Sequence, residues 1–451
     1  MLPLEVVVAA TTLLAAAAGT WLLRSTPKAE RGPRGEKLDP AGGTRLKNLL
    51  GYGMALIAKH RERQACAKAS LRELEAFHKP EPHPFFNESF YFHGCDRDTG
   101  DHVSARLSRH GSGAEKSYVV FFLDIAGVGI FSFERDDVPV SDAARASGRP
   151  SACGLELECL EPMRKWRLRF DGKMRRGCHT PQQARTLSDS DLIEVDVDLV
   201  YERQTPVFYY MRDDCAETLA NNLSQEPWGI QFAKVCLNRS KNHGHYEDFG
   251  TLSGTVRING ISSREYAFDT FRDHSWDIRR WATMDSVLIL LVTLEEPLHL
   301  FGHEYWFLDL TLVSMPGNTS GVARYSTGYM LPKESLDPDA PVLCLVRGTS
   351  ILDVPWVRHP DGTREPEAET DVVMYVRPEA AQMPAIPVRV HMSGTVRRLI
   401  YYPDGNQFQY MEDGLDFRVT NLASGQQVKA YGSRQSGFRQ GDFDPSLGGC
   451  G

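Results

Sequence analysis

Short runs that alternate between apolar and polar residues dominate the sequence after Phe85, and they limit the fold more than any other feature. Residues 193–202 read IEVDVDLVYE, and similar runs begin near Leu252 and Val388. A period of two residues indicates a strand with one wet face, whereas a helix needs a period near 3.6. The runs do not alternate with helical patterns, so we expect antiparallel sandwiches or barrels and not a parallel sheet.

The chain length and a weak internal similarity indicate how the β region is divided into domains. The chain has 451 residues, enough for two or three domains. Residues 162–176 and 388–398 share a weak pattern of a strand, a glycine and a basic pair. This pattern fits two similar β domains in tandem, which we place at residues 85–285 and 286–451. Asn259-Gly260 predicts a type I′ hairpin turn within the first domain.

An uncharged run of 18 residues, Val6–Leu23, lies close to the N-terminus. It is just long enough to cross a bilayer as a helix, and Trp21 stands near its end, where interfacial aromatic residues are enriched. The alternative is a cleaved signal peptide. Such a peptide has basic residues before its apolar run, but here Glu5 comes first. We therefore expect a transmembrane anchor over residues 1–24.

The charges that flank this run predict its orientation. Basic residues from Arg24 to Lys37 follow the run, and no Lys or Arg precedes it. Because basic flanks stay cytosolic, we expect a single-pass protein of the endoplasmic reticulum or another endomembrane, with a cytosolic body. A lumenal body is the alternative, because the chain has four N-glycosylation sequons. Their asparagines are Asn87, Asn222, Asn238 and Asn318.

The cysteine content and the net charge limit the kinds of site and partner that we expect. The nine cysteines are odd in number and scattered, without CxxC spacing, so we expect neither a disulfide framework nor a structural zinc site. Acidic residues exceed basic ones, 59 against 51, which gives a net charge of −8. A protein that binds phosphate backbones is normally basic, so nucleic acid is not an expected partner.

Residues 25–84 are predicted to form a linker and an amphipathic helix. The linker is rich in proline, glycine and charge, and helical spacing of apolar residues then runs from Leu46 to His78. Pro80 ends the pattern. An ordinary helix packed on the protein body explains the pattern. A helix lying on the membrane surface is the alternative, favoured by closeness to the anchor.

Residues 243–250, with the sequence HGHYEDFG, form an unusual polar stretch. On a regular strand, His243, His245 and Glu247 would share one face, and two imidazoles with a carboxylate suit zinc or iron. Against this alternative, Gly244 favours a turn and the spacing matches no standard ligand motif. We therefore predict no metal site.

Residues 271–277, with the sequence FRDHSWD, form a second such stretch. Arg272, His274 and Trp276 share one face of a regular strand, and Asp273 takes the other. A carboxyl in an apolar cavity has a raised pKa, and a histidine titrates near neutral pH, so Asp273 and His274 are candidate catalytic acid/base groups. Both cannot face one lumen without a bulge. The alternative is an arginine–carboxylate pair that closes a barrel end.

Together, HYEDFGTLSGTVRING and FRDHSWDIRRW resemble the pattern HYE-x-x-G…RDHSWG-x-R-x-W of a family of large lipocalin-like proteins. That family is similar to the AttH and hydroxyneurosporene synthase (carotenoid 1,2-hydratase) group. The resemblance covers roughly residues 85–440 and departs at Asp277, where the pattern has glycine. It implies two calycin-type barrels around an apolar cavity, and in some relatives a cofactor-free hydration or cyclisation of terpenoid-like substrates. The matching positions are His245, Tyr246, Glu247, Arg272, Asp273, His274, Ser275, Trp276, Arg279 and Trp281.

These observations predict an all-β protein with two tandem antiparallel lipocalin-like barrels, preceded by a transmembrane helix and an amphipathic helix. We expect a membrane-anchored binding protein whose partners are the lipid bilayer and a hydrophobic small molecule, lipid or terpenoid-like, with no cofactor. The first alternative is a cofactor-free hydratase or cyclase that uses Asp273 or His274 on a polyprenoid or sterol-like substrate. The second is a structural module with filled barrels. The predicted ligand-binding residues are His245, Tyr246, Glu247, Arg272, Trp276 and Trp281.

Overall fold

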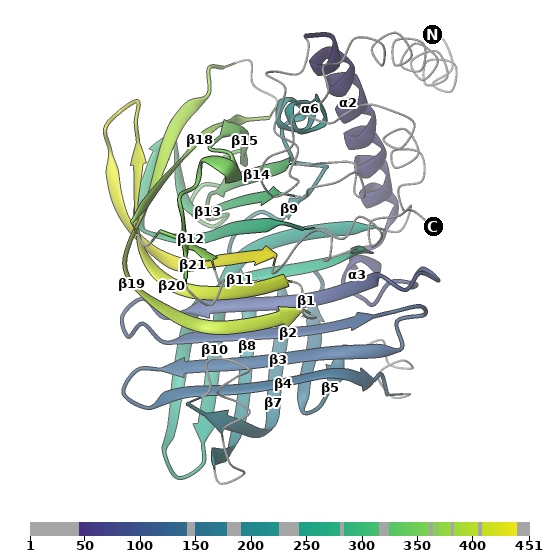
Figure 1. The fold of residues 1–451 in the computed structure, drawn as a ribbon, viewed down its shortest axis with the longest axis vertical. Coiled ribbons are helices and arrows are strands. Elements are labelled where there is room, and N and C mark those ends of the chain that lie inside the picture. Colours follow the sequence, from purple (N-terminus) through teal and green to yellow (C-terminus); the bar gives the residue numbers. More distant parts are fainter. Residues whose placement is uncertain are drawn as a thin grey trace.

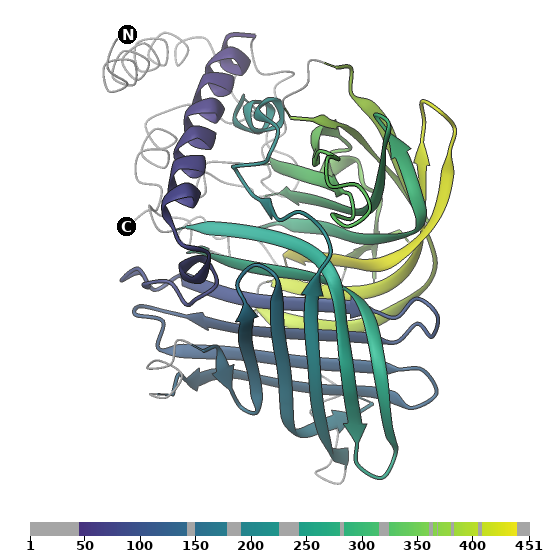
Figure 2. The ribbon, with the colours of Figure 1, turned by 180° about the vertical axis from the view of Figure 1, so that it is seen from behind.

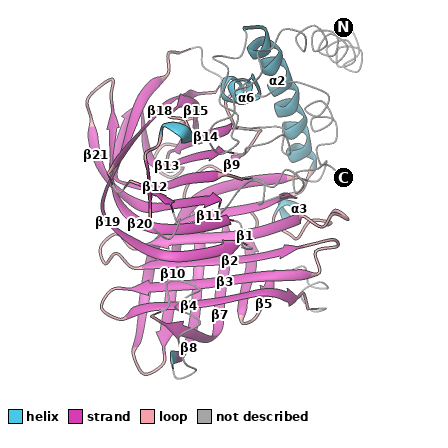
Figure 3. Cartoon of the chain, in the orientation of Figure 1, coloured by secondary structure: helices cyan, strands magenta, loops and turns pink. Residues whose placement is uncertain are grey.

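The computed structural model describes ten stretches of the chain and is mostly β-structure, with its few helices gathered mainly on one side (Figure 3). The predicted anchor and Trp281 lie outside the described residues. Within them, no helix combines the length and the apolar character needed to span a bilayer. The described residues are 45–141, 149–177, 191–224, 243–279, 284–314, 324–359, 364–367, 369–379, 383–404 and 408–439.

The first group of strands forms one 11-stranded antiparallel sheet in the order β4-β3-β2-β1-β11-β10-β8-β7-β6-β5, with β9 paired to β10. The bounds are β1 Phe86–Cys95, β2 His102–His110, β3 Lys116–Ile125, β4 Gly129–Pro139, β5 Ser151–Ala152, β6 Leu155–Glu161, β7 Lys165–Arg176, β8 Leu192–Arg203, β9 Phe208–Tyr209, β10 Gly244–Ile258 and β11 Ser262–Ile278.

This sheet bends over itself into two layers. Strands β1 to β4 run across one layer, and β7, β8 and β10 run steeply across them in the other (Figures 1 and 2). The bend brings β4 next to β7, and the two strands pair at Phe131↔Arg176 and Ser132↔Arg175. Between the layers lies a core of buried aromatic and aliphatic side chains, including Phe90, Phe121 and Leu199.

The second group of strands forms a closed antiparallel barrel of eight strands, in the order β12-β13-β14-β15-β18-β19-β20-β21. A short 3-10 helix, η3, and a small sheet of β16 and β17 lie within its β15–β18 connection. The bounds are β12 Ser286–Leu300, β13 His303–Ser314, β14 Arg324–Leu331, β15 Leu343–Gly348, η3 Ile351–Asp353, β16 Trp356–Arg358, β17 Arg364–Pro366, β18 Thr370–Pro378, β19 Ile386–Asp404, β20 Phe408–Asn421 and β21 Gln427–Arg439.

The interior of the barrel is a continuous apolar core. Leu288, Leu290, Leu310, Val390 and Val419 belong to it, and each is almost fully buried. The all-β prediction is therefore confirmed, with one closed barrel. A simple closed first barrel is not what the structure shows, because β5 and β6 extend the first sheet beyond β7 and the β4–β7 contact covers only two residue pairs.

The helices differ from the predicted single helix over residues 46–78. They are α2 (Arg45–Lys68), α3 (Leu71–Leu74) and α6 (Ala216–Ser224). Ser70 separates the first two, because its side chain accepts the amide proton of Glu73 while the Glu73 carboxylate accepts that of Ser70, at 3.2 and 2.8 Å. This reciprocal cap starts a new helix.

The buried face of α2 is made of small residues and one lysine, not of the large apolar ones. Ala55 is 1% exposed and packs with residues of α6, and a Cβ at Gly51 would lie 3.1 Å from the Ala220 carbonyl oxygen of α6. Leu49 and Leu56, which set the helical pattern in the sequence, are 69% and 46% exposed. The spacing of the apolar residues thus predicted the helix, but the face it indicated as buried is exposed to solvent.

The outward faces of the large sheet and the barrel pack against each other. We call this contact the seam: the outward sides of β1, β10 and β11 against those of β12, β13, β14, β20 and β21. Aromatic side chains fill part of it, among them Phe249 and Phe271 from the sheet and Phe307 from the barrel. Tyr91 adds a hydrogen bond to Glu412 at 2.6 Å.

Two of the four sequon asparagines are buried in this fold. Asn87 is 7% exposed on β1, and Asn222 is 4% exposed on α6, where its amide donates to the Ser326 carbonyl at 2.9 Å. Neither side chain has room for a glycan in the folded protein. The other two, Asn238 and Asn318, lie outside the described residues, so the argument for a lumenal body now rests on them.

Candidate functional site at the seam

The two polar motifs meet because β10 and β11 form a hairpin. Glu247 pairs with Asp273, and Tyr246 pairs with His274. The hairpin was predicted correctly from Asn259-Gly260, but the prediction of a type I′ turn was wrong. The connection has three residues, and among its non-glycine residues none has positive φ, while Gly260 has φ +69°. A type I′ turn would require positive φ at both central residues.

Side-chain alternation sends the motif residues to opposite sides of the hairpin. Tyr246, Arg272, His274 and Trp276 face the interior of the large sheet, where they are almost fully buried. His245, Glu247 and Asp273 face the seam, where they contact one another. The sequence-based expectation that Asp273 and His274 take opposite faces therefore agrees with the structure. The predicted ligand-binding residues form two separate groups.

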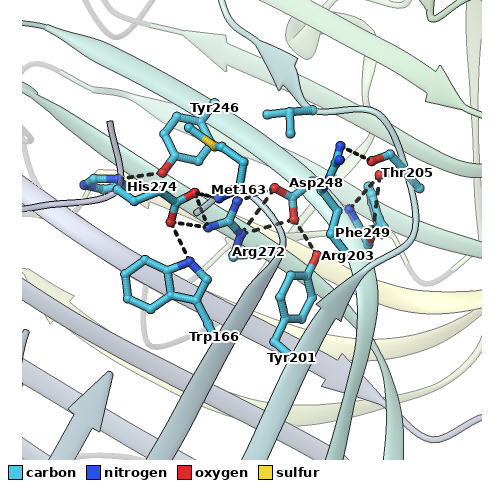
Figure 4. A network of polar contacts seen from close by, with 12 residues as sticks. Met163, Trp166, Tyr201, Arg203, Thr205, Tyr246, Asp248, Phe249, Arg272 and His274 are labelled. Atoms are coloured by element: carbon cyan, nitrogen blue, oxygen red, sulfur yellow. Dashed lines mark hydrogen bonds and ion pairs between the residues drawn. The ribbon is translucent and has the colours of Figure 1, made fainter. Parts of the chain in front are cut away.

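Arg272 is the centre of the inner group (Figure 4). Its guanidinium donates to both oxygens of Glu75 at 3.0 and 2.9 Å, and to Asp248 at 3.1 Å. The Trp166 indole also donates to Glu75, and the Tyr201 hydroxyl to Asp248. Glu75 directly follows α3, so this fully buried network ties α3 to the sheet. It corresponds to the alternative raised from the sequence, in which Arg272 forms a structural pair with a carboxylate.

His274 is also held on every side. Its Nε2 lies 3.2 Å from Glu88, its Nδ1 lies 2.9 Å from the Tyr246 hydroxyl, and its ring stacks on Phe90 at 3.8 Å. Burial lowers the pKa of His274 below its usual value. With no exposed surface and both ring nitrogens engaged, His274 serves as a packing and hydrogen-bonding residue in this structure.

Glu88 carries the charge of this inner group. It accepts hydrogen bonds from His78 and from Arg109, each at 2.8 Å, in addition to the contact with His274. Burial alone would raise the pKa of Glu88, but the hydrogen bonds from His274 and His78 lower it to about 2. His78, Glu88 and His274 lie close enough to hold one ion, yet the Arg109 guanidinium already neutralises the carboxylate.

Gly244 is explained by the same packing. Trp276 stacks on His78 with ring centroids 3.6 Å apart, and its indole crosses β10 at Gly244. A Cβ at Gly244 would lie 2.2 Å from that ring. Glycine therefore permits close approach here and does not mark a turn. Asp277 of β11 stands where the related pattern has glycine, and it pairs with Asn87 of β1. Asp277 has no positive φ, so no special backbone angle is needed there.

The seam group is a cluster of titratable side chains. His245 Nε2 lies 3.0 Å from Glu247 Oε1 and also contacts Asp273. The Tyr210 ring stacks on His245 at 4.0 Å, and its hydroxyl donates to Glu247 at 2.9 Å. Tyr329 of the barrel donates to the same carboxylate at 2.6 Å. We call these five residues, together with Asp309, the seam cluster.

Asp309 of β13 gives the cluster a further carboxyl. It is fully buried, its Oδ1 accepts from Thr311 at 3.3 Å, and its Oδ2 has no hydrogen-bond partner within the described residues. Burial and the neighbouring Glu247 raise the pKa of Asp309 well above its usual value. Burial and a neighbouring carboxylate both favour the neutral form of such a carboxyl.

The other members of the cluster are shifted in different directions. Burial would lower the pKa of His245, but the charges of Asp273 and Glu247 raise it to about 9. Burial raises the pKa of Glu247, whereas His245 holds that of Asp273 below its usual value against burial. The cluster therefore combines an ion pair, His245 with Asp273, and two carboxyls whose pKa values are raised, Glu247 and Asp309. Titratable groups pushed apart in this way are typical of acid–base sites.

The cluster is close to solvent at one end. The side chains of His245 and Asp273 are 28% and 13% exposed, whereas Glu247 is 6% exposed. His245, Glu247 and Asp273 also lie close enough to hold one metal ion. The metal alternative raised from the sequence had His243 as its third ligand, but His243 lies 3.7 Å from Glu62. The charge of Arg279, like that of His245, lowers the pKa of Asp273.

Sequence reasoning missed Tyr210, Tyr329 and Asp309. Tyr329 is 82 positions from Glu247, and it comes from another sheet. A local pattern cannot report a contact between two sheets. One usable signal existed, since Asp309 interrupts the apolar run of residues 305–313, and an acid within a buried strand indicates a partner or a function.

The fold and this cluster define an all-β protein with a group of titratable side chains between a large sheet and a closed barrel. A family described as "Domain of unknown function (DUF7064)" matches residues 72–330, more than half of the sequence, and the chain belongs to that family. No curated protein matches the chain.

Solved structures similar to this one include two different proteins. A Nitrosomonas europaea protein described as AttH is 10% identical, with 82% of this chain and 97% of that chain covered and a TM-score of 0.46. CghA is 11% identical, with 80% and 89% covered and a TM-score of 0.41. Its structure with Sch210972 gives a TM-score of 0.42.

Proposed function

We propose that this protein is an acid–base catalyst that acts on a hydrophobic small molecule at the seam. The observation that supports the proposal is the convergence of His245, Glu247, Asp273 and Asp309 from two sheets, with pKa values displaced in opposite directions. Such an arrangement costs folding free energy, since each buried charge must be desolvated. A purely structural contact would be served as well by apolar residues.

The roles follow from charge and exposure. His245, held as an imidazolium by Asp273, is more exposed than Asp273 and Glu247 and gives a proton to the substrate. Asp309, whose carboxyl pKa is raised, supplies the proton that restores it. Tyr210 and Tyr329 position the Glu247 carboxyl through their hydroxyl groups. Proton transfer by positioned groups of this kind accelerates reactions by roughly 10² to 10⁴-fold.

A hydrophobic substrate fits the surroundings of the cluster. Phe208, Phe249, Phe271 and Phe307 pack beside Tyr329 in the seam. Protonation of an alkene in an aromatic setting leads to hydration or cyclisation, the class of reaction expected for a polyprenoid or sterol-like substrate. This assignment replaces His274 with His245 as the histidine of the site and keeps Asp273.

Binding without turnover is the second candidate, and the buried charge network of Arg272 favours it, because rigid supporting networks also serve ligand carriers.

Attachment to a bilayer, through residues 1–24, suits either candidate because the ligand would partition into lipid. The exposed Leu49, Tyr52 and Leu56 on α2 support a membrane-facing side. Carbonate extraction of the full chain tests this attachment, and Leu14→Lys should release the protein.

The test of catalysis compares the full chain with its Asp273→Asn variant. Each protein is incubated with a lipid extract in D₂O, and untargeted mass spectrometry follows products that gain deuterium or the mass of water. We expect such products with the unaltered protein and at least about 10²-fold less with Asp273→Asn. Asp196→Asn, at an exposed ion pair with Arg257, is the matched control and should keep full activity.

Equal product formation by the unaltered protein and Asp273→Asn would contradict the catalytic proposal. A lipid that co-purifies in equal amounts with both, without conversion by either, would establish the binding candidate in its place.

A further inference from the structure

Cys215 and Cys344 form a buried pair where the connector after β9 meets the barrel. They are 2% and 1% exposed and share a small apolar cluster with Val346. Cys215 directly precedes α6, and Cys344 lies on β15. The Cys344 thiol donates to the Arg377 carbonyl at 3.5 Å, beside Cys215 in the same cluster. Neither residue takes part in the seam cluster.

The first turn of α6 is fixed on the barrel around this pair. The Thr218 hydroxyl donates to the Leu345 carbonyl, next to Cys344 in the chain. Arg377 of β18 donates to Glu217 at 2.8 Å. These contacts bring Cys215 and Cys344 into one buried cluster from two segments that are far apart in the sequence.

The surroundings of Cys215 favour a thiolate. The backbone amides of Glu217 and Thr218, at the N-terminus of α6, donate to its sulfur, and Arg377 also reaches it. The hydrogen bond from Cys344 and these amides lower the pKa of Cys215 to about 6. Burial raises that of Cys66 to about 11. A thiolate is the reactive form of cysteine, so Cys215 differs in kind from Cys66.

We propose that Cys215 and Cys344 are a modification site, at which a peroxide converts the two thiols into a disulfide that ties α6 to β15. The Cys215 thiolate attacks one oxygen of hydrogen peroxide, which breaks the O–O bond and gives a sulfenic acid, and the leaving hydroxide takes up a proton as water. Cys344 then loses its proton, its sulfur attacks Cys215, and the displaced hydroxide leaves as a second water. Two thiols are oxidised and one peroxide is reduced.

Peroxide is the oxidant class that suits this place. It is small enough to reach a thiolate that is only 2% exposed, whereas a bulky disulfide reagent would require the helix to move away.

The experiment treats the full chain with hydrogen peroxide, blocks the remaining thiols, and maps peptides without reduction. We expect a Cys215–Cys344 linked peptide that has lost two hydrogens and forms at least about ten-fold faster than oxidation of Cys66 or Cys159. In Cys344→Ser, Cys215 should accumulate as a sulfenic acid that dimedone traps. In Cys215→Ser, Cys344 should remain a thiol. Far-UV circular dichroism confirms that each variant is folded.

Two results would overturn the proposal. One is a fully oxidised sample in which Cys215 and Cys344 stay unlinked. The other is oxidation of Cys215 at the same rate as Cys66 in the same protein. The melting temperature should rise on oxidation and return on reduction, because a crosslink over a long loop restricts the unfolded chain. An unchanged melting temperature would contradict the claim that the bond ties α6 to the barrel.

Discussion

Tyr329 of the barrel donates a hydrogen bond to Glu247 of the large sheet over 2.6 Å, and its ring stacks on Phe208 at 4.1 Å. The candidate site therefore depends on two units at once. Glu247 is oriented by one tyrosine from the connector, Tyr210, and by one from the barrel. If the barrel moved away, the carboxyl would lose a donor and gain water. Contact between the two units therefore completes the seam cluster, because Tyr329 and Asp309 come from the barrel.

The first prediction tests this contact. Tyr329→Phe removes the hydroxyl and leaves the ring, so the Glu247 carboxyl loses a charge-assisted hydrogen bond. We expect a loss of about 1.5–3 kcal/mol in the free energy of unfolding, measured with urea. Tyr305→Phe is the control, because its hydroxyl donates at 2.9 Å to the neutral Pro341 carbonyl and should cost about 0.5–1.5 kcal/mol. A smaller loss for Tyr329→Phe than for Tyr305→Phe would refute this view of the seam.

The second prediction concerns alkaline pH. The pKa of His245 is raised from 6.5 to about 9, so its contribution to stability is fully present below pH 6.5 and is lost as the pH rises through 9. Urea midpoints should fall over that interval in the unaltered protein, and the fall should be smaller in His245→Asn. His391→Asn, at a surface histidine paired with Asp371, should keep the original slope. Identical slopes in all three proteins would show that His245 is not charged in the fold.

The third prediction concerns acidic pH. The pKa of Glu88 is lowered from 4.5 to about 2, so its stabilising effect is present above pH 4.5 and is lost as the pH falls towards 2. The shift corresponds to at most about 3 kcal/mol. Glu88→Gln should remove this part of the acid dependence, measured as the difference in unfolding free energy between pH 5 and pH 2.5. The prediction fails if the variant loses as much stability as the unaltered protein over that range.

The fourth prediction concerns the network around Arg272. Arg272→Met keeps much of the side-chain volume but leaves Glu75 and Asp248 as buried carboxylates without their cation. Breaking a buried pair on one side costs about 3–5 kcal/mol. Arg257→Met, at an exposed pair with Asp196, should cost at most about 1 kcal/mol. Chemical unfolding curves compare them, and equal losses would mean that the network is not a main support of α3.

Local sequence patterns predicted the strands well and the assembly less well. The alternation at residues 193–202 became β8, and the hairpin of β10 and β11 formed where Asn259-Gly260 stands. These features depend on neighbours in the chain. The bending of the first sheet until β4 meets β7 depends on packing between distant strands, which no local period reports.

The site was predicted in its parts but not in its grouping. Alternation correctly separated Asp273 from His274, and it placed Glu247 beside His245 on one face. It could not show that the seam face and not the sheet interior would hold the acid–base cluster. That distinction depends on Tyr329 and Asp309, which the barrel supplies. The break at Ser70 was within reach, because Ser70 and Glu73 match the capping-box spacing.

The last prediction concerns Gly244, where the structure gives glycine a packing role and not a turn. In Gly244→Ala the new Cβ would lie 2.2 Å from the Trp276 ring, so the indole must leave its stack on His78. We expect a loss of about 1–3 kcal/mol in unfolding free energy and a changed tryptophan fluorescence spectrum. Gly53→Ala is the matched control, because Gly53 lies within α2 with open space around it and should stabilise the protein by about 0.5–1 kcal/mol. If Gly244→Ala were tolerated as well as Gly53→Ala, the glycine between the two histidines would have no packing role.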